Sequence, residues 1–239
     1  MTDPATVIAD KGYAALGAEE ARALFDPAGT ALSGPAWEGF VASWGDLRPD
    51  AYMADGGRYR LRRHAIFTAP PGAPLARAPD GPHFQATRYN ALNGGIDRWF
   101  EPVLPSVSEG GAMRALLEGA RGVFDRLSPG SSWHVEVHQF RIEARPEESG
   151  KPTPEGMHAD GVDYVLVMMI GRENVAGGIT GIQIDAKEEA SFTLSAPCDA
   201  VLLDDRRVMH GVTPIHPLDP SRPGYRDVLV LTFRKGQKS

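Results

Sequence analysis

Cysteine is almost absent from this sequence, which contains Cys198 and no other thiol among its 239 residues. A single cysteine excludes an intrachain disulfide and a cysteine-rich zinc site, and it is typical of a reducing compartment. Long apolar runs are also missing, and none approaches the length that spans a membrane. The N-terminus shows no basic region followed by a long apolar stretch, so we expect no signal peptide. These absences favour a cytoplasmic protein with no membrane partner.

The sequence also lacks an excess of positive charge. It has 25 Lys and Arg residues against 31 Asp and Glu residues, a formal net charge of −6, which argues against a nucleic-acid partner. Its 42% apolar and 23% charged residues are ordinary for a globular protein. The length allows one large domain or two small ones, and we interpret residues 1–239 as a single domain.

The apolar pattern divides the chain into a helical beginning and a β-rich remainder. Helical spacing predicts short helices over Pro4–Ala14, Gly17–Phe25 and Trp37–Trp44, so residues 1–50 are interpreted as an α-rich cap. One apolar stripe predicts a longer helix at about 108–127, which ends at a Ser-Pro-Gly turn. Alternation and short apolar runs predict strands within the following stretches: 52–68, Phe84–Leu92, Trp133–Ile142, Tyr164–Ile170, Ile179–Ile184, Ser191–Leu194, Ala200–Leu203 and Arg226–Phe233. Early helices and late strands favour a mainly β fold with flanking helices (α+β), whose core spans residues 52–239.

His158 and Asp160 precede one of the most apolar runs in the chain. In extended backbone both side chains lie on one face, where they can bind a metal and leave much of its coordination sphere free. Among the later histidines, His210 follows an apolar strand and a charged turn, whereas His216 is interpreted as a loop residue. Two histidines and one carboxylate are typical of non-haem Fe(II) oxygenases. A closed zinc site would fill all four positions, and the chain offers no thiolates to do so.

The order of these residues, followed by Arg226 in a late strand, resembles the 2-oxoglutarate/Fe(II)-dependent dioxygenases. The resemblance is closest to the bacterial hydroxylases of free L-amino acids, of the isoleucine 4-hydroxylase type, and covers roughly residues 80–235. It rests on five stretches: Val137–Arg141, His158–Gly161, Gly177-Gly178, Val208–Pro214 and Tyr225–Phe233.

This resemblance implies a double-stranded β-helix (jelly-roll, cupin-like) core with an N-terminal helical cap. It also implies Fe(II), 2-oxoglutarate and O2 as cofactors, with His158, Asp160 and His210 as the iron ligands. Related halogenases lack the carboxylate, so that halide can bind the iron. Asp160 therefore favours hydroxylation or another oxidation.

Arg226 is the predicted partner of the distal carboxylate of 2-oxoglutarate, through a planar two-pronged ion pair. A charged residue in an otherwise apolar strand needs a partner, which the co-substrate would supply. Thr232 lies on the same strand face and could add a hydroxyl contact. The alternative is an edge arginine paired with Asp227 or Asp205.

Substrate contacts are harder to assign. The candidates for binding a carboxylate, an amino group or another polar group are Arg60, Arg62, Arg88, Asn90, His138, Gln139, Arg141 and Asp163, with Glu136 as an alternative to Asp163. Gln139 and Arg141 share one strand face and His138 lies on the other, so one set is expected to point into the barrel. A solvated or structural role is the alternative for each candidate. Alternation over residues 58–63 favours a strand with a solvated basic face, and residues 204–207 favour a surface ion cluster.

We therefore expect an enzyme that hydroxylates an aliphatic C–H bond of a free L-amino acid or a similar small polar substrate. One alternative is the same chemistry on a peptide, a carrier-bound residue or a natural-product intermediate. Another is a cupin-like binding module without turnover. The expected partner is a small molecule, and a homodimer is possible.

Overall fold

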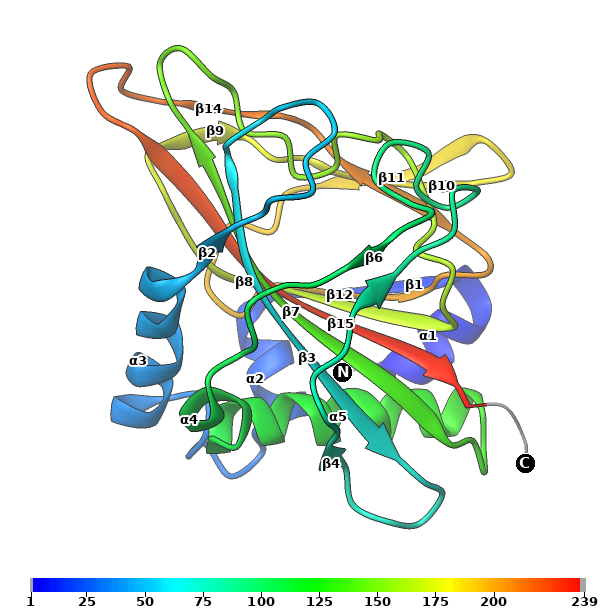
Figure 1. Cartoon of the computed structure of the whole chain (residues 1–239). Helices are drawn as coiled ribbons and strands as arrows, with labels where there is room; N and C mark the ends of the chain where they lie inside the picture. Colours follow the sequence, from blue (N-terminus) through cyan, green and yellow to red (C-terminus); the bar gives the residue numbers. More distant parts are fainter. Residues whose placement is uncertain (1, 237–239) are drawn as a thin grey trace.

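The computed structural model describes residues 2–236, in which helices cover one face of a large sheet (Figure 1). The helices are α1 (Pro4–Lys11), α2 (Ala18–Phe25), α3 (Gly34–Ala42), the 3-10 helix η1 (Ser43–Asp46), α4 (Pro105–Ser108) and α5 (Gly111–Leu127). The strands are β1 (Tyr13–Leu16), β2 (Arg48–Pro49), β3 (Arg60–Ala69), β4 (Ala76–Arg77), β5 (His83–Phe84), β6 (Asp97–Arg98), β7 (Trp133–Ala144), β8 (Tyr164–Glu173), β9 (Val175–Gly177), β10 (Thr180–Ile184), β11 (Lys187–Phe192), β12 (Ala200–Asp204), β13 (Met209–Val212), β14 (Ile215–Pro217) and β15 (Gly224–Lys235).

The large sheet has eight strands in the order β1-β12-β8-β15-β7-β3-β2, with β4 paired to β3. Its pairs are antiparallel. At its centre β7 and β15 run in continuous register, from Trp133 opposite Lys235 to Ala144 opposite Gly224. Because side chains alternate along a strand, these two strands give the sheet one apolar face and one polar face.

The apolar face of the sheet packs on α5, whose stripe of buried residues follows the helical period. Phe124 of α5 stacks on Tyr164 with ring centroids 4.8 Å apart and meets Phe233 at 5.0 Å. Helices α1, α2 and α3 pack against α5, and their buried residues belong to the same hydrophobic cluster. This shared cluster supports the proposal of a single domain. Within residues 2–236, no helix is long and apolar enough to cross a membrane.

Three smaller sheets complete the fold: β11-β10-β13, β14-β9 and β5-β6. Residues of β5, β6 and β13 line the same cavity as the polar face of β7 and β15. The large sheet thus has helices on one side and shorter strands and loops on the other. The predicted mainly β fold with flanking helices is confirmed.

Two predicted elements differ from the structure. The helix predicted over residues 4–14 ends at Lys11 because Gly12 adopts a φ of 83°, and Tyr13–Leu16 forms an edge strand against β12. The strand predicted over Phe84–Leu92 is wrong, since the chain turns after Phe84. Its turns are closed by local hydrogen bonds: the backbone N–H of Tyr89 donates to the Ala86 oxygen at 2.9 Å, and that of Asn93 donates to Asn90 Oδ1 at 2.7 Å.

Two smaller differences concern the late strands. The strand predicted over Ser191–Leu194 begins earlier and ends at Phe192, because residues 187–192 pair with β10. His216, predicted in a loop, lies in the short strand β14, which pairs with β9. The long helix predicted at about 108–127 corresponds to α5, which begins at Gly111, while Ser108 ends the separate short helix α4.

Candidate metal centre and co-substrate cavity

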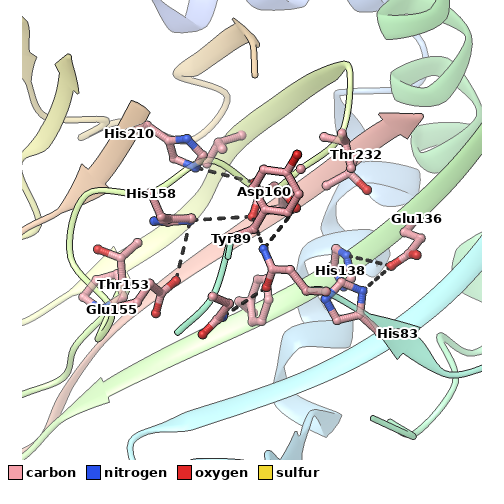
Figure 2. A pocket seen from close by; sticks show the side chains of 18 of the residues that line it. His83, Tyr89, Glu136, His138, Thr153, Glu155, His158, Asp160, His210 and Thr232 are labelled. Atoms are coloured by element: carbon pink, nitrogen blue, oxygen red, sulfur yellow. Dashed lines mark hydrogen bonds and ion pairs between the residues drawn. The ribbon is translucent and has the colours of Figure 1, made fainter. Parts of the chain in front are cut away.

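A cavity of about 320 Å³ opens on the polar face of the large sheet (Figure 2). The even-numbered residues of β15 from Arg226 to Arg234 line it, beside those of β7 from His134 to Ile142. Its other walls come from the segment that carries β5 and β6, from residues 152–162 and from β13. Odd-numbered residues of the same strands point away from the cavity, and six of them belong to the hydrophobic core around α5: Trp133, Val135, Val137, Leu229, Leu231 and Phe233.

Two histidines approach each other across a backbone bridge at the cavity wall. The N–H groups of His158 and His210 donate to each other's carbonyl oxygens, at 2.9 and 2.8 Å, and the ring centroids lie 4.5 Å apart. His158 Nδ1 lies 3.0 Å from the carbonyl oxygen of Gly156. This contact assigns the ring proton to Nδ1 and leaves the Nε2 lone pair for a metal, as outer hydrogen bonds do for ligating histidines.

Asp160 lies between the two imidazoles, with Oδ1 3.6 Å from His158 Nε2 and Oδ2 3.6 Å from His210 Nε2. One ligand atom from each residue lies within 4.8 Å of the other two. Two imidazoles and one carboxylate on one side of a metal suit Fe(II) with open coordination positions. The donor set therefore fits an iron site, and the three residues predicted from the sequence are brought together.

The charges of these three groups are coupled. Although burial opposes ionisation of Asp160, the hydrogen bond from His158 and the charges of both imidazoles hold the pKa of Asp160 below its usual range. Burial also opposes a charge on His158, but Asp160 and Glu155 raise its pKa to about 9. Burial and the neighbouring His158 charge lower the pKa of His210 to about 4. A divalent cation would have to displace the proton on His158.

Asp205 fixes the loop that carries Asp160. Its carboxylate accepts hydrogen bonds from the backbone N–H groups of Asp160, Gly161 and Val162, at 2.8, 2.7 and 3.0 Å. The residue is 3% exposed, so the predicted surface ion cluster is wrong for Asp205. Burial and the negative charge of Asp160 raise the pKa of Asp205 to about 6. Gly161 completes the turn with a φ of 81°, where a Cβ would collide with the Tyr89 ring.

Gln85 supports Asp160 from the opposite side. Its Nε2 donates to the Asp160 backbone oxygen at 3.2 Å and to Oδ1 at 3.3 Å. Its Oε1 accepts from Asn90 Nδ2 at 3.0 Å and from Arg98 Nη2 at 3.4 Å. These contacts fix which end of the amide faces the metal ligands. This role of Gln85 was not predicted, because the residue was expected to lie in a regular strand.

Arg226 is a buried cation that forms no ion pair with a carboxylate in the described part of the chain. It is 2% exposed, and its Nε and Nη2 find no acceptor within residues 2–236. Asp227 is paired with Arg141 through a contact of 2.6 Å, which does not favour the alternative of an edge arginine paired with Asp227. Burial and the cross-strand neighbour Arg172 lower the pKa of Arg226 to about 10. Two unpaired donors of one guanidinium group fit a carboxylate such as that of 2-oxoglutarate.

Thr232 lines the cavity beside Asp160 (Figure 2). It lies six residues beyond Arg226 in β15, so their backbones are separated by about 20 Å along the strand. The two side chains therefore cannot hold the same carboxylate. A contact between Thr232 and 2-oxoglutarate would have to be at the metal end of that molecule.

The arginines of β3 point into the cavity wall. Arg60 and Arg62 are buried, and Asp50 Oδ2 lies 2.8 Å from Arg60 Nε and 3.6 Å from Arg62 Nη1. Arg62 also lies between two aromatic rings, 3.6 Å from the Phe100 centroid and 4.5 Å from that of Phe140. The preferred interpretation of a solvated basic face is therefore wrong for these residues.

Other substrate candidates divide between the cavity and its surroundings. Asn90 and His138 line the cavity, as does exposed Arg88, which lies over the Tyr89 ring. Three candidates do not line it: Gln139, Arg141 and Asp163.

These three candidates have other partners. Gln139 donates to Ser43 Oγ at 2.8 Å, while Arg141 pairs with Asp227 on the opposite side of the strand. Asp163 accepts a hydrogen bond from the Lys235 backbone N–H at 2.8 Å. We therefore do not propose Gln139, Arg141 or Asp163 as substrate contacts.

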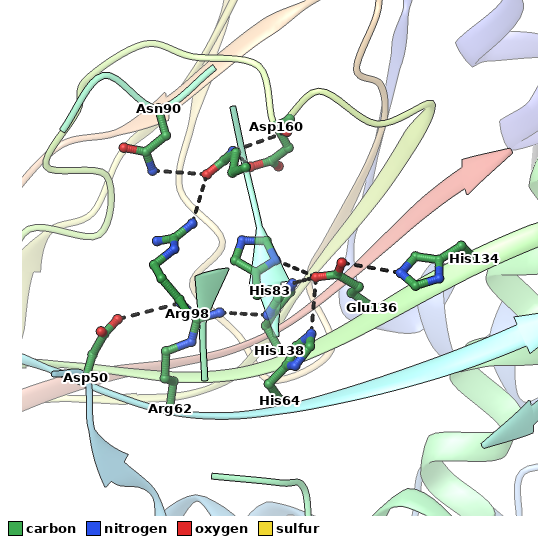
Figure 3. Close-up of polar contacts among 11 residues, drawn as sticks. Asp50, Arg62, His64, His83, Asn90, Arg98, His134, Glu136, His138 and Asp160 are labelled. Atoms are coloured by element: carbon green, nitrogen blue, oxygen red, sulfur yellow. Dashed lines mark hydrogen bonds and ion pairs between the residues drawn. The ribbon is translucent and has the colours of Figure 1, made fainter. Parts of the chain in front are cut away.

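A second group of imidazoles surrounds Glu136 on the cavity wall (Figure 3). Glu136 Oε2 lies 3.1 Å from His64 Nε2 and accepts a short hydrogen bond from His83 Nδ1. Ligand atoms of His64, His83, Glu136 and His138 lie within 4.8 Å of one another. Although burial opposes a charge on Glu136, the imidazole hydrogen bonds hold its pKa far below the usual range.

The arginine beside this group argues against a second metal ion. Arg62 Nη2 donates to His138 Nδ1 at 2.8 Å, which assigns the imidazole proton to Nε2, the nitrogen that faces Glu136. A protonated nitrogen is not a metal ligand. We interpret the group as an ionised carboxylate held by imidazole donors.

The sequence matches the 2OG-Fe dioxygenase family over residues 41–232. The chain belongs to this family and is a 2-oxoglutarate-dependent dioxygenase, with Fe(II), 2-oxoglutarate and O2 as its cofactors. The predicted family, enzyme class and cofactors are confirmed.

The chain is similar to the 3(1)-hydroxy-L-isoleucine 4-dioxygenase of Pantoea ananatis, with 27% identity over 163 residues. The match covers 66% of this chain and 65% of that relative, less than two thirds of the relative's length. A solved bsmA homolog from Methylobium petroleophilum is 39% identical, covering 98% of this chain and 92% of that one, with a TM-score of 0.86. The Fe(II)/α-ketoglutarate-dependent dioxygenase TqaL shares the fold, with a TM-score of 0.77 at 16% identity over 98% of this chain and 86% of that one. These likenesses confirm the predicted jelly-roll core and the resemblance to the bacterial amino-acid hydroxylases.

Proposed function

We propose that the protein hydroxylates an aliphatic C–H bond of a free L-amino acid or a similar small polar molecule. The observation that carries this proposal is a single cavity lined by the trio of His158, Asp160 and His210 and by unpaired Arg226. The trio would hold Fe(II), and Arg226 would bind the distal carboxylate of 2-oxoglutarate. Together with O2, these cofactors supply the oxidation of an unactivated C–H bond and leave succinate and CO2.

The residues around the trio support this chemistry. Asp160 supports hydroxylation over halogenation, because its carboxylate takes the metal position that a halide would need. Gly156 and Asp205 hold two of the proposed ligands from behind through hydrogen bonds. On the sheet, Val228 and Val230 separate Arg226 from Thr232 on the cavity face of β15, which gives the bound co-substrate an apolar wall.

Cavity size and the relatives support a small substrate. A volume of about 320 Å³ lies at the low end of small-molecule pockets, so little space remains beside 2-oxoglutarate. The Pantoea ananatis relative is named for a hydroxylated L-isoleucine, which supports an amino acid in this chain. The homodimer and the cytoplasmic location stay predictions.

Anaerobic titration with Fe(II) and then 2-oxoglutarate tests the assignment of the ligands. We expect a weak visible charge-transfer band that is lost in His210→Ala and retained in His216→Ala, a matched histidine outside the cavity. Succinate release in air, measured with each free L-amino acid, tests the substrate. A folded protein without the band would contradict the ligand assignment. A band without amino-acid-dependent turnover would favour a peptide or carrier-bound substrate.

A further inference from the structure

Arg98 on β6 is a second buried arginine without an acidic partner in the cavity wall. It is 2% exposed, and its Nε has no acceptor in the described part of the chain. Its hydrogen bond to Gln85 Oε1 is long, at 3.4 Å. Asp50 interacts with Arg98 through its charge, but the Asp50 carboxylate is already paired with Arg60 at 2.8 Å. Arg98 therefore has the burial of a binding residue and forms no ion pair with a carboxylate among residues 2–236.

Three buried arginines line this part of the cavity, and the carboxylate of Asp50 pairs with two of them, Arg60 and Arg62. Among residues 2–236, each of the three leaves a buried donor without an acceptor: Arg60 Nη2, Arg62 Nε and Arg98 Nε. A buried charge is costly unless it is paired, so an anionic ligand is the natural complement of this group. The cluster is distinct from the place of Arg226. Arg60 and Arg226 lie on either side of Ile142 in β7, with backbones about 10 Å apart. If 2-oxoglutarate binds at Arg226, the second anion must come from another molecule.

Glu155 supplies the opposite charge in the same cavity. Its Oε1 lies 3.6 Å from His158 Nε2, and its buried Oε2 has no hydrogen-bond donor among the described residues. Its charge also reaches Arg98. Glu136 is less suited to bind a cation, because both of its oxygens already face imidazole nitrogens. The cavity therefore offers unpaired donors and an unpaired acceptor to one ligand.

We propose that Arg98 and Glu155 bind the charged head of the substrate, an α-amino acid with a free carboxylate and a free ammonium group. Arg98, with Arg60 and Arg62 behind it, binds the carboxylate, and Glu155 binds the ammonium group. This inference rests on the proposed function and deepens it, because a carrier-bound residue has no free carboxylate. Figure 3 shows Arg98 and Asp160 near one another, and the Gln85 amide contacts both. The head group would thus be separated from the metal trio by about one side chain, so the side chain of a small amino acid bound there could reach the metal.

Calorimetric binding to the full chain tests the inference, with Mn(II) in place of iron and with saturating 2-oxoglutarate. The proteinogenic L-amino acids are screened, and the one that binds most tightly is compared with its methyl ester and its N-acetyl derivative. Each derivative lacks one charge of the head group. We expect each to bind at least about 30-fold more weakly, since removing one partner of a buried charge pair has effects of this size.

Two variants assign the charges to residues. Arg98→Met is expected to weaken binding of the amino acid at least about 30-fold and to change binding of the methyl ester less than about threefold, because the ester has no carboxylate to lose. Glu155→Gln should show the same pattern with the N-acetyl derivative. The affinity for 2-oxoglutarate should be unchanged in both variants, which also shows that they are folded. Arg114→Met changes an exposed arginine of α5 and serves as the matched control.

The outcomes separate this inference from the proposed function. If an amino acid binds and both variants retain its affinity, the assignment to Arg98 and Glu155 is overturned and the proposed function stands. If the methyl ester binds as tightly as the free acid, the carboxylate site is overturned. If the wild type binds Mn(II) and 2-oxoglutarate but no amino acid, the inference and the proposed substrate class both fail.

Discussion

Replacing Asp205 by Asn is expected to weaken metal binding, although Asp205 is not a proposed ligand. Its two carboxylate oxygens accept three backbone N–H groups of residues 160–162, and this loop carries Asp160. An asparagine keeps one acceptor oxygen, and its NH2 group would face at least one of these N–H groups. The variant would therefore keep the shape of the side chain and lose the order of the loop.

The magnitude follows from the hydrogen bonds that are lost. A hydrogen bond to a charged group contributes about 1.5–3 kcal/mol, and at least one of the three cannot form in Asp205→Asn. Substitutions of residues that support metal ligands lower metal affinity by about 10- to 100-fold, which corresponds to about 1.4–2.7 kcal/mol. The two ranges overlap, so we expect a loss of that size. Mn(II) titration followed by electron paramagnetic resonance measures it without turnover.

Asp204→Asn provides the matched control. Asp204 lies in the same turn, and its Oδ1 accepts a hydrogen bond from the Arg206 backbone N–H at 3.2 Å. Within the described part of the chain, Asp204 forms no hydrogen bond with residues 160–162. We expect its Mn(II) affinity to equal that of the wild type. An Asp205→Asn variant that binds Mn(II) as tightly as the wild type would refute the reasoning, as would an equal loss in both variants.

Three further predictions concern other groups. Metal analysis after loading with Zn(II) should give one equivalent per chain in the wild type and in Glu136→Gln, because the group around Glu136 binds no metal. A second equivalent in the wild type that is lost in the variant would contradict this. Asp50→Asn should lower the free energy of unfolding at pH 7 by about 3–5 kcal/mol, because two buried arginines lose their carboxylate. Burial opposes ionisation of Asp50, but Arg60 and Arg62 hold its pKa below 3.8. The stabilisation that the ionised carboxylate contributes is therefore complete above pH 3.8 and is lost as the pH falls through the pKa of the folded state. The difference in unfolding free energy between the wild type and Asp50→Asn, measured in urea, should accordingly shrink in acid. Burial raises the pKa of Cys198 to about 11, so iodoacetamide at pH 8 should label it only after unfolding; rapid labelling of the native protein would count against this.

Part of the metal trio was predictable from a local pattern, whereas His210, 50 residues beyond Asp160, was found from the order of the later histidines and from the family resemblance. His158 and Asp160 are two residues apart, and alternation alone places them together. Arg226 was also predictable, since a charge within an apolar strand needs a partner. In contrast, Gln85 and Asp205 contact the loop of Asp160 from positions 75 and 45 residues away along the chain. Such distant contacts leave no periodic pattern in a single sequence.

Errors arose where a pattern had two physical explanations. Alternation showed that Arg60 and Arg62 share a strand face, but it could not show whether that face meets solvent or a cavity. Residues 84–92 alternate in polarity, yet they form turns because local backbone and side-chain hydrogen bonds replace those of a neighbouring strand. The first half of the early strand β1, Tyr13 and Ala14, was predicted to be helical, although Gly12 before it was a signal for a helix end.

The alternation of β7 and β15 also bears on how this protein can evolve. Core residues and cavity-facing residues alternate along these two strands, as Leu229 and Leu231 do with Val230 in β15. Substitutions at cavity-facing sites such as Phe140 and Val230 can therefore change the preferred ligand while the main hydrophobic cluster around α5 stays intact. A deletion of one residue within β15 would do the reverse, since the residues on one side of the deletion would exchange their core-facing and cavity-facing positions. Natural diversification and laboratory libraries should accordingly tolerate exchanges along these strands far better than changes in their length.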